Sequence, residues 1–156
     1  MNHIRRKLLK SATYIGVTAT ALSTGLLIPQ RVLGAYASEG FAAKDVSGAL
    51  KGSLGSDQHS ESGQIKLKAP DIAENGAVVP ITVSSTLGNV EAISIVIPGN
   101  PSPLTSTYML PAGTEAFVST RVKMGKTSNV IAVVKADGKL YSATKEVKVT
   151  IGGCGG

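Results

Sequence analysis

The most regular pattern along the chain is an alternation of apolar and polar residues that begins at Ile65. Runs with this period of two cover residues 65–68, 79–84, 93–97, 104–110, 117–124, 130–134 and 139–150. Successive side chains of a β-strand point to opposite faces of a sheet, so the alternation predicts strands that are buried on one face. The sequence therefore predicts about seven half-buried strands.

Residues that favour turns separate these runs. Asn75-Gly76, residues 98–103 and residues 111–113 are rich in Pro, Gly and Asn. Asp137-Gly138 lies between the last two runs and favours a two-residue hairpin turn, because both residues tolerate positive φ. Pro80 has no N–H to donate, so we expect its strand to lie at a sheet edge or to be paired on one side only at that residue.

The number and spacing of the predicted strands indicate the fold class. About seven strands in about 90 residues are typical of an immunoglobulin-like antiparallel β-sandwich, which is an all-β fold. The disulfide and the core Trp of true immunoglobulin domains are absent, since the chain has one Cys and no Trp. The sequence also has no Gly-rich phosphate loop, strand–helix alternation or internal repeat, which argues against a nucleotide-binding enzyme.

The segment before the strands has a different period. Apolar residues recur there at roughly helical spacing, at Phe41, Val46, Leu50 and Leu54. This spacing predicts one short amphipathic helix between Gly40 and Leu54. Residues 55–63 have turn composition and no apolar period, which predicts an exposed loop. His59 lies in this loop, and a lone histidine in such a place is expected to face solvent rather than to bind a ligand.

The first 37 residues have the pattern of a cleaved export signal. A basic stretch that contains Arg5 and Arg6 precedes an uncharged, moderately apolar stretch, and small residues at Ala35 and Ala37 fit a signal peptidase site. The paired arginines resemble a twin-arginine signal. The apolar stretch has only about 17 residues, fewer than the roughly 20 that span a bilayer. We expect cleavage after Ala37, export by the twin-arginine route, a periplasmic location and no membrane contact in the mature form.

The net charge of the chain comes mostly from this N-terminal segment. The 156-residue chain has a formal charge of +6, but five of its cationic residues and none of its acidic residues lie in the first 37, so the remainder carries +1. The remaining lysines are scattered among acids, and few aromatic residues remain. Without a basic stripe or stacking aromatics, the sequence argues against nucleic-acid binding.

The candidate chemistry lies in the last five residues. The only cysteine, Cys154, is flanked by Gly152 and Gly153 on one side and by Gly155 and Gly156 on the other. Glycines bury no side chain and leave the backbone free, so we expect a narrow swinging arm over residues 152–156, after a sandwich domain over residues 38–151. One Cys and two His give little material for a metal or haem site, so we expect no metal, cofactor or catalytic residue.

An unpaired cysteine in an exported protein implies an intermolecular disulfide or a reactive thiol. No His, Arg or Lys adjoins Cys154, and the terminal carboxylate disfavours a thiolate, so we expect the pKa of this thiol to be near or above that of a free thiol. A lipoprotein is excluded, because the acylated cysteine of such proteins directly follows the signal peptide.

These features together resemble the SoxY family of the bacterial sulfur-oxidation (Sox) system. The resemblance covers nearly the whole chain. It rests on the leader with Arg5 and Arg6, residues 72–76 followed by Val79-Pro80, residues 121–124, and above all the terminal Gly-Gly-Cys-Gly-Gly.

The resemblance implies a periplasmic carrier rather than an enzyme. Cys154 would be loaded covalently with thiosulfate, and the arm would present the bound intermediates to successive enzymes. The implied partners are a SoxZ-like subunit in a heterodimer, a SoxAX-type haem cytochrome complex, a SoxB-type dimanganese hydrolase that releases sulfate and, in some organisms, a sulfane dehydrogenase. The SoxZ-like subunit lacks its own leader, so the two chains would be exported already folded together.

Two other functions remain open from the residues alone. A ubiquitin-like sulfur carrier also ends in Gly-Gly and holds sulfur as a terminal thiocarboxylate, although it would need neither an export signal nor Cys154. An exported structural module would use Cys154 for an intermolecular disulfide. Mass spectrometry after thiosulfate loading and non-reducing gels would distinguish these alternatives.

Overall fold

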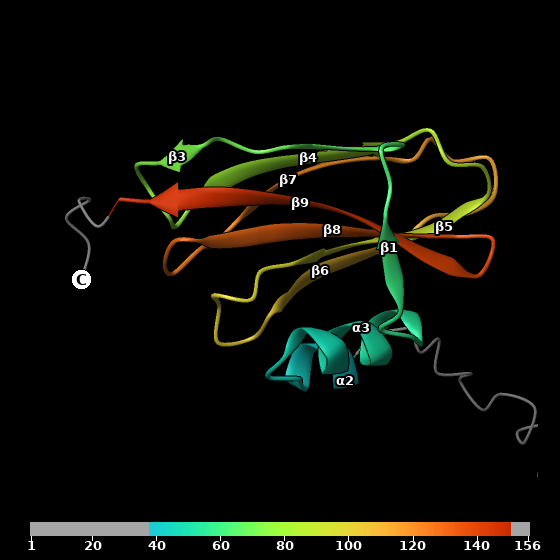
Figure 1. The fold of residues 1–156 in the computed structure, drawn as a ribbon, viewed down its shortest axis with the longest axis horizontal. Helices are drawn as coiled ribbons and strands as arrows, with labels where there is room; N and C mark the ends of the chain where they lie inside the picture. Colours follow the sequence, from blue (N-terminus) through green and yellow to red (C-terminus); the bar gives the residue numbers. More distant parts are fainter. Residues whose placement is uncertain (1–37, 151–156) are drawn as a thin grey trace, which may run out of the picture. The chain divides into compact units, whose positions relative to one another are not determined.

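A computed structural model describes residues 38–150, and these residues form a β-sandwich with two helices (Figure 1). The larger sheet has the strand order β1-β9-β8-β5-β6, with β3 also paired to β9, and the smaller sheet has the order β2-β4-β7. The elements are α2 (Ser38–Ala42), α3 (Val46–Leu54), β1 (His59–Glu61), β2 (Ile65–Lys68), β3 (Ile72–Ala73), β4 (Val79–Ser85), β5 (Val90–Val96), β6 (Leu104–Met109), β7 (Phe117–Val122), β8 (Ser128–Ala136) and β9 (Lys139–Val149). The predicted all-β sandwich is confirmed.

The core between the two sheets is formed by the residues that alternate along the predicted strands. Val79, Ile81 and Val83 of β4 are buried, and they pack with Ile93 and Ile95 of β5 from the other sheet. The ladders β4–β7, β5–β6, β5–β8 and β8–β9 are all antiparallel. Each of the seven predicted runs corresponds to a strand, so the period-two pattern located the sandwich correctly.

Two of these strands are buried on both faces, which corrects the expectation that all are half-buried. In β5, Ala92 and Val96 lie on the face opposite Ile93 and Ile95 and are also fully buried. They pack against α3, as does Val133 of β8. The helices cover the outer face of the larger sheet, and Figure 1 shows them on the side away from β4 and β7.

The helical segment contains two helices rather than the single one predicted. Asp45 separates them, because its backbone is extended and its side chain accepts a hydrogen bond from the Gly48 N–H at 2.6 Å as the N-cap of α3. Leu50 and Leu54 of α3 are buried, as the helical spacing predicted. After the helix, hydrogen bonds from Ser47 and Lys51 lower the pKa of Asp57 below its ordinary value.

Two short strands were missed, so the described residues contain nine strands rather than about seven. β1 lies inside the segment predicted as a loop, and β3 has only two residues. Both pair in parallel with β9. All three residues of β1 are exposed, so there is no burial period for the sequence to reveal. His59 is exposed as expected, but its Nδ1 lies 3.0 Å from Ser142 Oγ of β9.

The predicted turn and proline constraints agree with the structure. Asp137 and Gly138 both have positive φ and join β8 to β9 by a two-residue turn, with Ala136 paired to Lys139. Pro80 is paired with Arg121 of β7, while the β2–β4 ladder begins only at Thr82. β4 is therefore the central strand of its sheet, and at Pro80 it is paired on one side only.

Candidate functional site: the end of β9

The predicted site residues lie outside the described part of the chain. This holds for Arg5 and Arg6 and for the arm, Gly152, Gly153, Cys154, Gly155 and Gly156. The structure instead shows where the chain leaves the sandwich on its way to Cys154. β9 ends at Val149, and Thr150 is the last described residue. We call residues 148–150 the arm root.

The arm root is held by hydrogen bonds from both sides. Pairing of β9 with β8 stops at Val147, which lies opposite Ser128. Beyond that point β3 takes over, because the Lys148 N–H donates to the Asp71 carbonyl at 3.0 Å and the Thr150 N–H donates to the Ala73 carbonyl at 3.1 Å. On the other side, the Val149 N–H donates to Thr127 Oγ1 at 3.0 Å. The strand is therefore fixed to its last residue.

Residues 69–78, which we call the β3 segment, accept two of these three hydrogen bonds and are themselves tied to the sandwich. Lys145 Nζ of β9 donates to the Ala69 carbonyl at 2.6 Å and lies 3.0 Å from the Asp71 carboxylate. The Met124 N–H donates to the Gly76 carbonyl at 2.7 Å. The Asn75-Gly76 turn was predicted from its composition, but no pattern in the sequence indicated that the segment pairs with β9.

Close packing at Gly76 completes the arrangement. A Cβ placed there would lie 2.4 Å from the Met124 carbonyl oxygen and 2.8 Å from Val149 Cγ1. No real side chain tolerates these distances, so Gly76 is the residue that lets the β3 segment approach β9 and the Met124 backbone closely.

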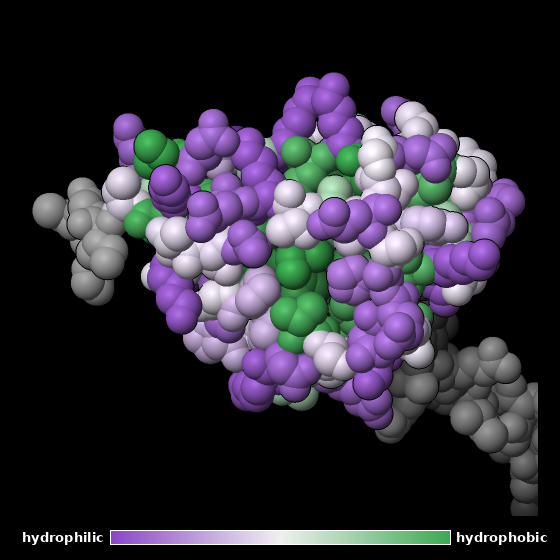
Figure 2. Space-filling model, in the orientation of Figure 1, coloured by the Kyte–Doolittle hydropathy of each residue, from purple (hydrophilic) through white to green (hydrophobic). Residues whose placement is uncertain are grey.

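The surface around the arm root is partly apolar. Ile72 and Val78 of the β3 segment are 57% and 51% exposed. Figure 2 shows apolar surface at the end of the sandwich where β3 and the tip of β9 lie. Asp71 and Glu74 of the β3 segment and Lys148 of β9 are exposed as well, so the exposed residues of these two elements carry both signs of charge.

A hollow among the described residues lies at the other end of the sandwich. It has a volume of about 870 Å³ and is lined by residues that include Val90 and Leu110. Val90 pairs with Ala136, which is opposite the first residue of β9, whereas the arm root is at the last residues of β9.

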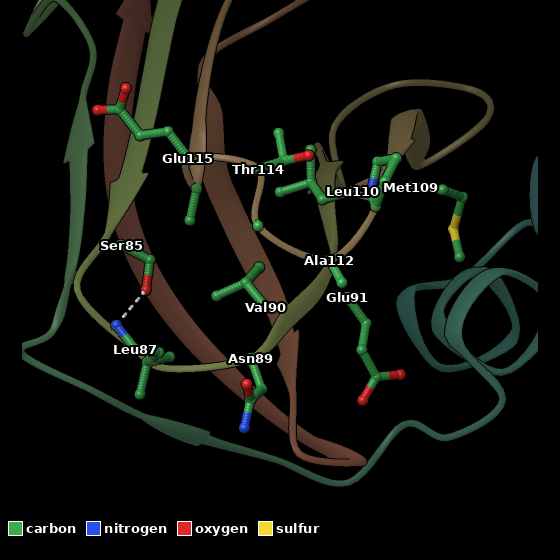
Figure 3. Close-up of a pocket in the computed structure, with 13 residues that line it drawn as sticks. Ser85, Leu87, Asn89, Val90, Glu91, Met109, Leu110, Ala112, Thr114 and Glu115 are labelled. Carbon is green, nitrogen blue, oxygen red and sulfur yellow. Dashed lines mark hydrogen bonds between the residues drawn. The ribbon is translucent and has the colours of Figure 1, made fainter.

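The acidic residues of the hollow lie apart. Figure 3 shows Glu91 and Glu115 at opposite sides of the hollow. Glu91 is engaged with the Gly138 N–H and Lys135, and the lining contains no Cys, His or Lys. The two acids of this hollow therefore do not form a pair.

The same part of the chain offers neither a cluster of metal ligands nor a membrane-spanning helix. Residues 38–150 contain no group of three or more His, Cys, Asp or Glu that could hold a metal ion. Within that range, no helix is long and apolar enough to cross a membrane. The arm root is thus the feature of the described structure that bears directly on Cys154.

Comparison with solved structures identifies a class of protein with this fold. The sulfur carrier protein SoxY from Chlorobium limicola f thiosulfatophilum is 43% identical, with a TM-score of 0.63 over 70% of this chain and 95% of that chain. The family model for sulfur oxidation protein SoxY matches residues 50–154, a match that ends on the cysteine itself. The chain belongs to the SoxY family of sulfur carrier proteins, as the sequence resemblance predicted.

A more distant neighbour shares the fold alone. A superoxide reductase (neelaredoxin) from Ignicoccus hospitalis is 20% identical, with a TM-score of 0.50 over 58% of this chain and 82% of that chain. At this identity the likeness concerns the sandwich and implies nothing about chemistry. No match was found among curated protein sequences.

Proposed function

We propose that this protein is a periplasmic carrier that holds thiosulfate-derived sulfur on Cys154 and presents it to the enzymes of the Sox pathway. The observation that carries the proposal is the family match, which extends to Cys154, the only cysteine in the chain. The arm root supports it, because hydrogen bonds fix β9 up to the point from which the glycine-flanked thiol departs.

The chemistry requires one thiol and two steps in other proteins. In the first step the Cys154 thiolate and thiosulfate lose two electrons together and form a sulfur–sulfur bond, which gives Cys–S–S–SO₃⁻. The implied haem cytochrome complex accepts the two electrons. In the second step water cleaves the bond to the sulfonate group, which leaves sulfate, two protons and Cys–S–S⁻ on the carrier. The implied hydrolase catalyses this second step, and no residue of the carrier needs to act as acid or base.

Arm length sets the geometry of these exchanges. Cys154 is four residues beyond Thr150, so its Cα lies at most about 14 Å from that of Thr150 at about 3.3–3.6 Å per residue. The glycines on both sides of Cys154 add no side-chain width. A thiol on such an arm fits an enzyme whose reacting groups lie at the bottom of a narrow channel.

Export and assembly form the second part of the proposal. The leader with Arg5 and Arg6 supports transport by the twin-arginine route to the periplasm. A SoxZ-like subunit would form the heterodimer and cross the membrane with this chain. A sulfane dehydrogenase would oxidise the sulfur that remains on Cys154 in organisms that contain one.

Intact mass spectrometry tests the carrier function directly. The purified protein is incubated with thiosulfate, the cytochrome complex and an electron acceptor, and we expect the mass to rise by one bound thiosulfate. Addition of the hydrolase should reduce the gain to one sulfur atom. Cys154→Ser should show neither gain, because serine cannot form the sulfur–sulfur bond.

The same experiment separates the two alternatives. An adduct that persists on Cys154→Ser would indicate a thiocarboxylate at Gly156 and overturn the proposal. A stable disulfide dimer on non-reducing gels, with no uptake of sulfur by wild-type protein, would instead identify a structural module.

A further inference from the structure

The strand β6 is an edge of the larger sheet, and it lacks the features that usually protect an edge from pairing with another chain. Such features are charged side chains, short length or a proline within the strand. The other strands that end a sheet have them, because β1 has three residues, β2 contains Lys66 and Lys68, and β7 contains Arg121. β6 has six residues, and residues 92–114 carry no charged side chain.

The register shows which backbone groups of β6 point away from the sheet. The Leu110 N–H donates at 2.8 Å to the carbonyl of the residue before Ala92, so Met109 and Ala92 lie opposite each other without mutual hydrogen bonds. Hydrogen-bonded and non-hydrogen-bonded pairs alternate along an antiparallel ladder. Tyr108 therefore exchanges its hydrogen bonds with β5, whereas the N–H and C=O groups of Thr107 and Met109 face the free edge.

These outward groups lie on a regular part of the strand. The β5–β6 register is uninterrupted from Ser106 to Met109, and its irregularity lies between Ile95 and Val96. The helices pack against Leu104, at the opposite end of β6. The Met109 side chain is 59% exposed. Within the described residues, no other strand pairs with the outer side of β6.

We propose that β6 pairs antiparallel with β6 of a second copy of this chain, about a two-fold axis at Tyr108. In this register Thr107 lies opposite Met109 of the second copy, and the two residues exchange both of their hydrogen bonds. All the outward N–H and C=O groups of the two residues are then used. An edge without charge meets no like charge on its own copy, and a two-fold interface joins a surface to itself. This inference does not depend on the proposed function.

Tyr108 favours this register. It lies opposite its own copy in a pair without mutual hydrogen bonds, in which the Cα atoms approach to about 4.5 Å. Aromatic pairs at such positions stabilise antiparallel sheets. The Tyr108 side chain is partly buried against the core between the two sheets, so it is held in place before the copies meet. On the other face, Met109 lies opposite the uncharged Thr107.

The two-fold axis keeps the two arms apart. Tyr108 lies in one cross-strand row with Ile93 of β5 and Tyr141 of β9. Thr150 is nine residues beyond Tyr141, or about 30 Å at about 3.3 Å per residue, and the two copies of β9 run in opposite directions. The two copies of Cys154 therefore lie too far apart to form a disulfide within this dimer, and both thiols stay accessible.

Analytical ultracentrifugation of the full chain under reducing conditions tests the pairing, because a reductant prevents a disulfide dimer. We expect the sedimentation coefficient to rise with protein concentration. Met109→Lys should raise the dissociation constant at least about tenfold, because the two introduced ammonium groups belong to diagonal neighbours about 7–8 Å apart and repel each other. Phe117→Lys is the matched control, since Phe117 is 50% exposed on β7 of the other sheet, and its dissociation constant should change less than about twofold.

Hydrogen exchange followed by NMR locates the contact at individual amides and needs no variant. At a concentration where the protein is mostly dimeric, the amides of Thr107 and Met109 should exchange about tenfold more slowly than at a concentration where it is monomeric. The amide of Tyr108 already donates to β5 in the monomer, so its rate should change far less. This measurement keeps the proposal testable if Met109→Lys does not fold.

Three results would overturn the proposal. A sedimentation coefficient that is independent of concentration would show that no dimer forms. Association without slower exchange at Thr107 and Met109 would place the contact elsewhere. Slower exchange at these amides only after addition of the SoxZ-like subunit would assign the edge of β6 to the heterodimer. Failure of Cys154 to take up thiosulfate would instead remove the proposed function and leave this dimer unaffected.

Discussion

Gly76 is a single residue on which the geometry of the arm root depends. It has an ordinary backbone conformation, so its importance comes from space rather than from φ. The Met124 carbonyl oxygen and Val149 Cγ1 occupy the region where a side chain would stand. Because one of these atoms belongs to backbone, the conflict cannot be relieved by a rotamer change alone.

We expect Gly76→Ala to lower the free energy of unfolding by about 1–3 kcal/mol, the usual cost of forcing an extra group into a packed site. Urea denaturation of the two proteins measures the difference. Gly88→Ala is the matched control, because a Cβ at Gly88 meets nothing within 4 Å and the residue has no positive φ. Its effect should stay within about 0.5 kcal/mol. Equal effects of the two substitutions would contradict the packing argument.

Among the elements, the long strands could be predicted and the supports of the arm root could not. The alternation of apolar and polar residues predicts β4 and β9, and the tolerance of Asp137 and Gly138 for positive φ predicts the turn between β8 and β9. β3 has two residues, too few for a period, and it is defined by hydrogen bonds to β9 that are remote in sequence. The second buried face of β5 depends on α3 packing there, which a strand's own sequence does not specify.

Lys145 shows how one strand positions the segment that supports its own end. Its ammonium group joins β9 to the Ala69 carbonyl and the Asp71 carboxylate, and Asp71 in turn accepts the Lys148 N–H through its backbone carbonyl. The carboxylate is exposed and its ion pair is weakened by solvent, so the hydrogen bond to the carbonyl is the stronger part of the contact.

In Lys145→Met we expect the amides of Lys148 and Thr150 to exchange with deuterium about three- to tenfold faster than in wild type. The acceptors of both amides belong to the β3 segment, which this substitution loosens. Hydrogen exchange followed by NMR measures the rates. Lys135→Met is the control. It removes the ion pair between Lys135 of β8 and Glu91 of β5, which lies near the start of β9, and should leave the exchange rates of both amides unchanged. Unaltered exchange in Lys145→Met would show that β3 is held without this side chain.

On the scale of the whole molecule, the sandwich holds the strand end from which the proposed carrier arm departs. Cys154 and its glycines remain a prediction from the sequence, based on a solitary cysteine between paired glycines, and they lie outside the described residues. The exposure of Ile72 and Val78 could not be predicted, since residues of the same kind nearby, Val79 and Ile81, are buried. Only the fold shows that Ile72 lies opposite Lys148, at the arm root.

The proposed carrier function requires an arm of sufficient length. This length can be changed by mutations that leave the residues of the sandwich as they are. Deletion of Gly152 and Gly153 shortens the maximum reach of Cys154 from Thr150 by about 7 Å. We expect kcat/KM for sulfate release from the loaded carrier to fall at least about a hundredfold, because misplacement of a reacting group by even 1 Å can cost that much.

The control variant Gly152→Ala/Gly153→Ala keeps the length of the arm, and its kcat/KM should fall far less. Alkylation by iodoacetamide should be equal in all three proteins, since a small reagent reaches the thiol wherever it stands. A deletion variant turned over as fast as wild type would mean that the enzyme acts at the surface of the sandwich and that the arm does not enter a channel.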